Sequence, residues 1–143
     1  MRIVIQGDML VPGEAEGLVL SSDEPISLWG GLDPTNGEII DRRHPLSGQI
    51  VTDRILSIPF GRGSCSASGV LLESVALGTG PAGIIVSKPD PILGLGAVLA
   101  DELLVRPVPV VLITEAERVS LGTDLRISIE SGGRIVAQPP DGL

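Results

Sequence analysis

The sequence predicts an α/β domain with a β-rich core and a central β-α-β-α-β unit. Residues 82–86 and 109–113 are continuous apolar runs, which are typical of parallel strands buried on both faces. Residues 91–104 lie between these runs and have the apolar spacing of a helix. The two strands are therefore expected to be parallel neighbours joined by a right-handed crossover. Alternating apolar residues near both ends of the chain, at 1–5 and within 125–137, indicate further strands.

The chain has 143 residues and is expected to form one domain over residues 1–143. Hydrophobic residues make up 43% of it, enough for a sizeable core, yet it contains one Trp, one Phe and no Tyr. Scarce aromatic rings and a net charge of −8 argue against a nucleic-acid-binding protein, which normally needs stacking rings or a basic surface.

Cys65 is the only cysteine, which excludes an internal disulfide and a metal cluster held by this chain's thiolates alone. The N-terminal segment alternates and then turns, unlike a secretory signal. The apolar runs are shorter than the ~20 residues that a membrane span needs. We therefore expect a soluble cytoplasmic protein that does not contact a membrane.

The N-terminal half is expected to hold short strands connected by turns. A turn-rich segment at 29–38 contains Asp33-Pro34 and Asn36-Gly37, which are strong turn dipeptides. Four segments of this half are expected to be extended, namely 14–20, 39–40, 49–51 and 54–60.

A first helix is expected over residues 65–77. Ala67, Leu71 and Val75 fall on one of its faces, and the glycines at 78–80 stop it. These four-residue spacings are typical of an amphipathic helix packed against a core.

The second helix, 91–104, has a proline at its first position and repeats Leu95, Leu99 and Leu103 on one face. Asp90 precedes it as a helix N-cap. Further along, residues 114–117 are expected to form a short helical turn. A hairpin is expected around Ser131-Gly132-Gly133.

Residues 61–68, Gly-Arg-Gly-Ser-Cys-Ser-Ala-Ser, connect an apolar strand to the first helix and form the candidate site. Such a junction collects free backbone N–H groups at the positive end of a helix dipole, which suits a phosphate or a carboxylate. Ser64 would expose its hydroxyl there, either as an activated base or as a helix N-cap. Arg62 is either a fork for such an anion or a solvated loop residue.

Two other features near this loop have both a chemical and a structural interpretation. A Cys–His nucleophile would need Cys65 and His44 to meet, and nothing in the sequence brings them together, so a packed cysteine is favoured. The turn Trp29-Gly30-Gly31 would either line a pocket or only change the chain direction.

Three segments in this order resemble the small subunit of the aconitase X family. The first runs from Pro25 to Gly48 and contains Trp29-Gly30-Gly31-Leu32-Asp33-Pro34 and His44-Pro45-Leu46. The second is the loop Gly61-Arg62-Gly63-Ser64-Cys65 with Ser68, and the third runs from Pro81 to Ala97. The resemblance implies a swivelling β/β/α domain with a barrel-like core, here as a separate chain.

The resemblance also implies a dehydratase, a hydro-lyase that is active only with a large subunit. That subunit would hold an iron–sulfur cluster through its own cysteines, so that no metal ligand is expected on this chain. Ser64 matches the aconitase serine that acts as general base. As an alkoxide it would remove the proton next to a substrate carboxylate, while the partner's cluster acts as a Lewis acid on the β-hydroxyl.

The expected substrate-binding residues are Arg62, Gly63, Cys65 and Ser66. Aconitase has a substrate-binding arginine at the position of Ser66, so arginine recognition must come from Arg62 or from the partner. The family contains bacterial enzymes that dehydrate cis-3-hydroxy-L-proline and archaeal enzymes that dehydrate mevalonate 5-phosphate. The residues of the loop and the following Leu71-Leu72-Glu73 look more like those of the bacterial members, which favours cis-3-hydroxy-L-proline as the substrate.

Two alternatives to a catalytic subunit are open. A swivelling domain can carry a phosphohistidine, but this role needs a histidine in the glycine-rich loop, and the one histidine is His44. The domain could also be a structural lid without a catalytic residue of its own.

Overall fold

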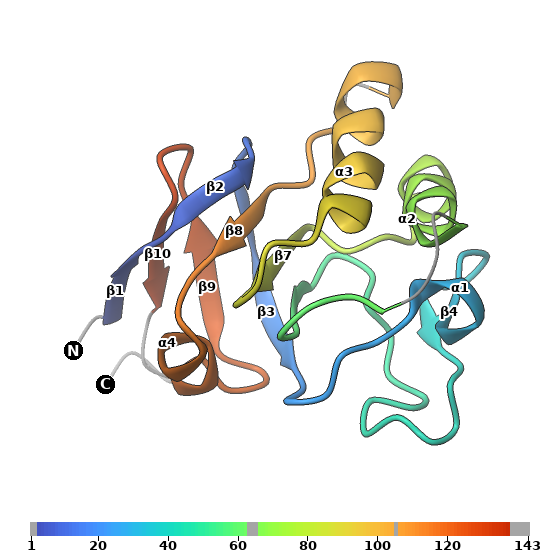
Figure 1. Ribbon diagram of the computed structural model, residues 1–143, viewed down its shortest axis with the longest axis horizontal. Helices are drawn as coiled ribbons and strands as arrows, with labels where there is room; N and C mark the ends of the chain where they lie inside the picture. The colour runs from blue at the N-terminus through green and yellow to red at the C-terminus, as the bar shows by residue number, and fades with distance from the viewer. Residues whose placement is uncertain (1–2, 63–65, 105, 138–143) are drawn as a thin grey trace.

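The computed structural model describes residues 3–62, 66–104 and 106–137, and Figure 1 shows their arrangement. The elements in chain order are β1 (Ile3–Gln6), β2 (Asp8–Val11), β3 (Ala15–Ser21), α1 (Leu28–Gly31), β4 (Leu32–Asp33), β5 (Glu38–Ile39), β6 (Ile55–Ser57), α2 (Ser66–Ala76), β7 (Gly83–Val86), α3 (Pro91–Leu104), β8 (Val110–Leu112), α4 (Glu115–Ser120), β9 (Arg126–Ile129) and β10 (Arg134–Ala137).

Eight of these strands form one curved sheet in the order β1-β10-β9-β3-β6-β7-β8-β2. Its two ends, β1 and β2, are consecutive along the chain, so the sheet nearly closes into a barrel at Gly7 between them. A Cβ on Gly7 would come within 2.5 Å of the Val111 Cγ2 and 3.0 Å of the Leu112 carbonyl oxygen. Closure therefore requires glycine at this position. The predicted α/β class with a barrel-like core is confirmed.

Strands β3, β6, β7 and β8 are parallel to one another. Their register aligns Leu20, Leu56, Ile84 and Val110 across the sheet. The two continuous apolar runs are thus parallel neighbours, as the sequence predicts. All four strands end at the same edge of the sheet, which is where ligands bind in open parallel sheets.

The core has two layers because the parallel strands are buried on both faces. Ile55, Ile85 and Val111 belong to one cluster with β1, β9 and β10, on the inner face of the curved sheet. Leu56 and Ile84, which alternate with them, pack in a second cluster with α2 and α3. Figure 1 shows α2 and α3 side by side against one side of the sheet.

The two main helices lie close to where the sequence predicts them. The first spans Ser66–Ala76 and the second Pro91–Leu104. They approach so closely that a Cβ on Gly96 would come within 2.9 Å of the Ser68 carbonyl oxygen. Among the described residues no helix is long and apolar enough to span a membrane.

Three details differ from the sequence-based expectations. The chain continues as β2 after Gly7, where a turn was expected, because β8 offers it a partner. Residues 49–51 form no ladder, and Ile50 makes an isolated bridge to Glu38. The repeat Leu95, Leu99 and Leu103 lies on the outer side of α3, where Leu95 and Leu103 are exposed and Leu99 is half-buried.

Candidate functional site

The candidate loop leaves the carboxyl edge of the parallel strands. β6 ends at Ser57, and the chain reaches Arg62 before α2 begins at Ser66. Arg62 and Ser66 are both exposed. Gly63, Ser64 and Cys65 lie outside the described residues, so the roles expected of them stay predictions.

The start of the loop is fixed by two neighbouring segments. The Arg62 backbone N–H donates to the Ile26 carbonyl oxygen at 2.9 Å, next to a parallel bridge between Ile26 and Gly61. The Gly61 N–H donates to the Asp90 Oδ2 at 2.6 Å. A Cβ on Gly61 would lie 2.7 Å from that oxygen, so only glycine lets the carboxylate approach the backbone here.

Asp90 connects the loop to the start of α3. Its Oδ1 accepts from the Leu93 N–H at 3.1 Å, which is the N-cap arrangement that the sequence predicts. Its Oδ2 holds Gly61, a link that the sequence pattern did not reveal. The side chain is 8% exposed. One buried carboxylate thus fixes the geometry of α3 and of the strand-to-α2 loop together.

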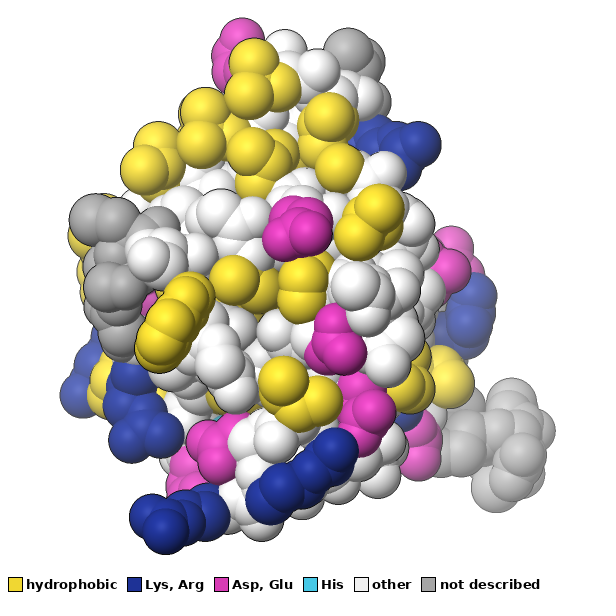
Figure 2. Space-filling view, turned by 90° about the vertical axis from the view of Figure 1, so that its right-hand side faces the viewer, with side chains coloured by type: hydrophobic (Ala, Val, Ile, Leu, Met, Phe, Trp, Pro, Cys, Tyr) yellow, Lys and Arg dark blue, Asp and Glu magenta, His cyan; other side chains and the backbone are white. Residues whose placement is uncertain are grey.

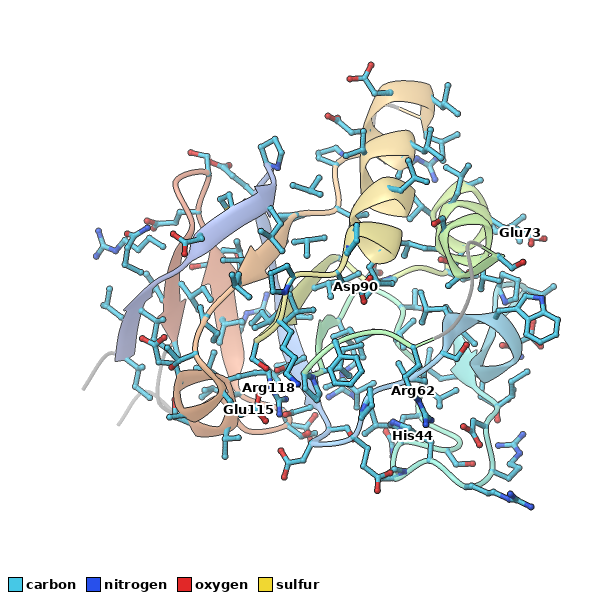
Figure 3. The ribbon with its side chains drawn as sticks, in the orientation of Figure 1. His44, Arg62, Glu73, Asp90, Glu115 and Arg118 are labelled. Carbon is cyan, nitrogen blue, oxygen red and sulfur yellow. The ribbon has the colours of Figure 1, made fainter. Side chains whose placement is uncertain are left out.

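A shallow hollow of about 340 Å³ lies beside this anchor, lined by Phe60, Gly61, Lys88, Pro89, Asp90 and Pro91. The Lys88 ammonium is 5.0 Å from the centre of the Phe60 ring. An ammonium over a ring face is attracted by the negative π cloud. Lys88 and Arg62 are the cations that flank Asp90 on the neighbouring segments, and both are exposed. Figure 3 labels Arg62 and Asp90, and in this view the Arg62 side chain points away from Asp90.

Arg118 occupies the same edge of the sheet and is fully buried. Its Nη1 donates to the Ser22 carbonyl at 2.9 Å and to the Ser57 carbonyl at 3.3 Å, where β3 and β6 end. Its Nε and Nη2 both reach the Glu115 carboxylate at 2.7 Å, and Nη2 reaches Asp23 at 3.2 Å. The guanidinium therefore joins α4 to the ends of β3 and β6, and β6 leads into the candidate loop.

This pair also shifts the titration of both groups. Hydrogen bonds from Arg118 lower the pKa of Glu115 to about 2, against a smaller opposing effect of burial. The same hydrogen bonds raise the pKa of Arg118 above its ordinary value. Figure 3 shows the two side chains next to each other. Glu115 three residues before Arg118, just after a buried strand, is the sequence signal that could have found this pair.

His44 is buried, and both of its ring nitrogens face backbone groups. Nδ1 accepts from the Leu46 N–H at 3.1 Å, and Nε2 lies 3.3 Å from the Glu24 carbonyl oxygen. A ring that accepts at Nδ1 carries its proton on Nε2, so the second contact is a donated hydrogen bond. His44 thus fixes the segment that leads to Ile26, which explains a buried histidine in a polar loop.

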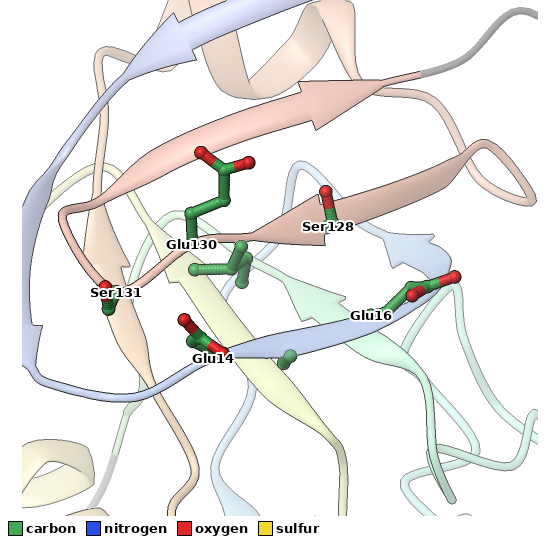
Figure 4. A pocket seen from close by; sticks show the side chains of 7 residues that line it. Glu14, Glu16, Ser128, Glu130 and Ser131 are labelled. Atoms are coloured by element: carbon green, nitrogen blue, oxygen red, sulfur yellow. The ribbon is translucent and has the colours of Figure 1, made fainter.

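A different hollow, of about 650 Å³, lies on the antiparallel side of the barrel. Figure 4 shows that Glu14, Glu16 and Glu130 surround it together with Ser128 and Ser131. Two arginines pair with these carboxylates, Arg126 with Glu16 at 2.9 Å and Arg134 with Glu130 at 3.7 Å. The arginines are thus already neutralised by the glutamates, and the third carboxylate makes the hollow unsuited to an anionic substrate. The carboxyl edge of the parallel strands, where Arg62 and Lys88 are exposed, is therefore the better candidate for a carboxylate or a phosphate.

An iron–sulfur cluster does not fit the residues of this chain. The chain has one cysteine, and clusters are held by several thiolates. Within residues 3–62, 66–104 and 106–137, no three His, Cys, Asp or Glu side chains are grouped so that they could hold a metal ion.

Comparison with known proteins gives a consistent result. The family model for the aconitase X swivel domain matches residues 4–137. The chain is 41% identical over 138 residues to a cis-3-hydroxy-L-proline dehydratase of Hypocrea jecorina, a match that covers 96% of this chain and 23% of that protein. It is 48% identical over 94 residues to the phosphomevalonate dehydratase small subunit of Methanopyrus kandleri, covering 66% of this chain and 68% of that one.

A crystal structure of Thermococcus kodakaraensis aconitase X in its holo form superimposes with a TM-score of 0.86 at 28% identity. The match covers 96% of this chain and 99% of that one. By contrast, this chain spans only about a fifth to a quarter of the length of the cis-3-hydroxy-L-proline dehydratases that it matches.

Proposed function

Because the chain belongs to the aconitase X swivel-domain family, we propose that it is the small subunit of a two-subunit hydro-lyase acting on cis-3-hydroxy-L-proline. The observation that carries this proposal is the 41% identity to a cis-3-hydroxy-L-proline dehydratase across 96% of the chain. Two exposed cations at the carboxyl edge support it, because a substrate of this kind presents a carboxylate that Arg62 and Lys88 can bind.

In this proposal Ser64 is the general base. Its deprotonated oxygen takes the proton from the carbon next to the carboxylate, and the C–H electron pair becomes the new double bond. The C–O bond at the β-carbon breaks, and its electrons leave with the hydroxyl oxygen. Ser64 follows Arg62 by two residues, and the Arg62 backbone is fixed to Ile26. A rigid approach to the loop would help to hold a base at one position.

The other residues of the loop have supporting roles in the same proposal. Arg62 binds the carboxylate, while Gly63, Cys65 and Ser66 contribute backbone N–H or hydroxyl donors at the start of α2. An eleven-residue helix begins at this point, so its positive end would stabilise an anion. The iron–sulfur cluster is assigned to the large subunit, because this chain lacks its ligands.

Mevalonate 5-phosphate is the second candidate substrate. It is supported by the 48% identity over 94 residues to the phosphomevalonate dehydratase small subunit of Methanopyrus kandleri. The two hypotheses differ in the anion that must be bound, a carboxylate alone or a carboxylate with a phosphate.

The test is to reconstitute the chain with the large subunit encoded in the same genome and to assay both compounds. We expect water loss from cis-3-hydroxy-L-proline. Turnover of mevalonate 5-phosphate alone would replace the first substrate by the second, and turnover of neither would contradict a dehydratase.

The general base is tested in the same complex with Ser64→Ala. We expect turnover to fall by about 10²–10⁴-fold while the two chains still associate. Ser131→Ala, in the exposed β9–β10 turn, is the matched control and should leave turnover unchanged. Activity of Ser64→Ala close to that of the wild type would remove Ser64 from the mechanism.

A further inference from the structure

Helix α3 is apolar on its outer face as well as on its inner face. Leu93, Ala97 and Ala100 are buried against the sheet and α2. On the outside, Leu95 is 50% exposed and Leu103 is 65% exposed. Large apolar side chains exposed in a row on a helix normally pack against another surface, so this side of α3 lacks a cover in the isolated chain.

The outer side of α2 separates the exposed apolar residues of α3 from those of α1. Its exposed residues are Ser66, Gly69, Glu73 and Ala76, and Val70 and Leu72 are half-buried beside them. α2 packs against both α3 and α1. Trp29 in α1 is the chain's one tryptophan and is 63% exposed. Its carbonyl accepts from the Ser27 hydroxyl at 3.0 Å, so the backbone that presents the indole is held in place. Figure 2 shows hydrophobic side chains gathered on this side of the molecule. We call Trp29, Glu73, Leu95, Val98 and Leu103 the outer helix face.

Within α2 and α3 the charged residues are all acidic, and the exposed cations Arg62 and Arg106 lie just outside these two helices. Glu73, Asp101 and Glu102 are the charged residues of α2 and α3, which carry no lysine, arginine or histidine. Two copies of the chain meeting through this face would bring these carboxylates together, on a molecule whose net charge is already −8. The face therefore fits an apolar partner surface with a basic rim better than it fits itself.

The outer helix face is continuous with the candidate site. Trp29 follows Ile26 by three residues, and the Ile26 carbonyl holds the Arg62 N–H. α2 itself begins at the candidate loop. A partner seated on Trp29 and the outer side of α2 would border the loop and exclude water from it.

We propose that the outer helix face is the surface on which the large subunit docks, an inference that rests on the proposed two-subunit function. In the Hypocrea jecorina relative the matching segment covers 23% of one longer polypeptide, so a peptide chain holds it to the rest of that protein. Other relatives are named small subunits, which implies that a separate large subunit is their partner. In the proposed two-subunit enzyme a contact surface takes the place of that covalent connection, and the apolar outer helix face supplies one.

The first experiment measures binding of the large subunit encoded in the same genome by isothermal titration calorimetry. We expect Leu95→Gln combined with Leu103→Gln to weaken binding by about tenfold or more, because large apolar anchors dominate such interfaces. Val119→Gln in α4 is the matched control, since Val119 is 52% exposed but lies away from α3, and its binding should be unchanged. Thermal unfolding by circular dichroism checks that each variant is folded.

The second experiment needs no substitution. The chain is labelled with 5-fluorotryptophan, which places one fluorine at Trp29, and its ¹⁹F spectrum is recorded with unlabelled large subunit. Docking on the outer helix face predicts a changed ¹⁹F shift that saturates at one equivalent.

The outcomes separate this inference from the dehydratase itself. Binding with the expected pattern but without turnover supports the docking surface and contradicts the proposed reaction. Equal affinity of the double variant with no ¹⁹F change, absence of binding by the wild type, or a homodimer that involves Trp29 would each overturn the docking surface.

Discussion

The carboxyl edge of the parallel strands and the antiparallel side of the barrel use their charges in opposite ways. At the carboxyl edge, Arg118 is fully buried. It pairs with Glu115 and holds the ends of strands β3 and β6. On the antiparallel side, Arg126 is 60% exposed and pairs with an equally exposed Glu16. Buried polar groups are costly unless satisfied, so they persist where they determine geometry. The contrast indicates which half of the molecule is built to hold a site.

The largest expected effect breaks this contrast directly. Arg118→Leu removes the Arg118 donor from the Ser22 carbonyl and one of two donors from the Ser57 carbonyl, which keeps the Ser22 N–H. It also leaves Glu115 without its partner and should lower the free energy of unfolding by about 3 kcal/mol. Arg126→Leu removes an exposed pair and should cost under about 1 kcal/mol. Urea unfolding of both variants measures the difference. Equal losses of unfolding free energy in the two variants would mean that Arg118 does not hold the carboxyl edge together.

The elements of the molecule could be predicted because their signals are local. The helices at Ser66–Ala76 and Pro91–Leu104 follow apolar spacing and capping residues. The hairpin of Arg126–Ile129 and Arg134–Ala137 follows alternation around two glycines. These patterns are short in sequence, so one sequence suffices to detect them.

The connections of the site could not be predicted because they join residues far apart in the chain. Arg118 meets Ser22 across 96 positions, and Asp90 meets Gly61 across 29. Closure of the barrel at Gly7 depends on β8 and β10, which no local pattern reveals. His44 lies in a polar loop in the sequence, yet it is buried, and its ring nitrogens contact the backbone of Glu24 and Leu46. The sequence shows neither contact. The roles of Gly63, Ser64 and Cys65 rest on family resemblance alone.

A second comparison sets two helix caps against each other. Asp90→Ala removes the cap of α3 and leaves the Gly61 N–H unpaired, so we expect a loss of about 2 kcal/mol in unfolding free energy. Thr114→Ala removes the exposed capping box of α4 and should cost about 1 kcal/mol. Asp90→Asn keeps one acceptor oxygen, so its loss of unfolding free energy should lie between those of Asp90→Ala and Thr114→Ala.

The same caps also differ in their effect on the reconstituted enzyme. Asp90→Ala should lower turnover, because the start of the candidate loop loses its anchor, whereas Thr114→Ala should not. The two variants are compared under conditions where the same fraction of each is unfolded. An equal fall of turnover in both would mean that the loss follows stability alone and that Asp90 has no role in the site.

The third comparison concerns the two hollows. Arg62→Gln should raise KM for the carboxylate substrate by about tenfold, the effect of one charge-assisted hydrogen bond, and Lys88→Gln by less. Glu16→Gln, in the acidic hollow of Figure 4, should leave kcat and KM unchanged. Steady-state kinetics of the two-subunit complex measures all three. A KM change confined to Glu16→Gln would place substrate binding on the wrong side of the barrel for the proposed function.

The smallest expected effect is the pH dependence that the buried pair gives to stability. Hydrogen bonds from Arg118 lower the pKa of Glu115 from 4.5 to about 2 in the folded protein. Between these values the unfolded chain binds more protons, so this group's stabilisation is complete above about pH 4.5 and is lost as the pH falls toward 2. Urea unfolding from pH 6 to 2.5 should therefore show a steeper acid loss in the wild type than in Glu115→Gln. Because Arg118 causes the shift, Arg118→Leu should flatten the same part of the curve, and an unchanged slope in both variants would assign the acid sensitivity to other carboxylates.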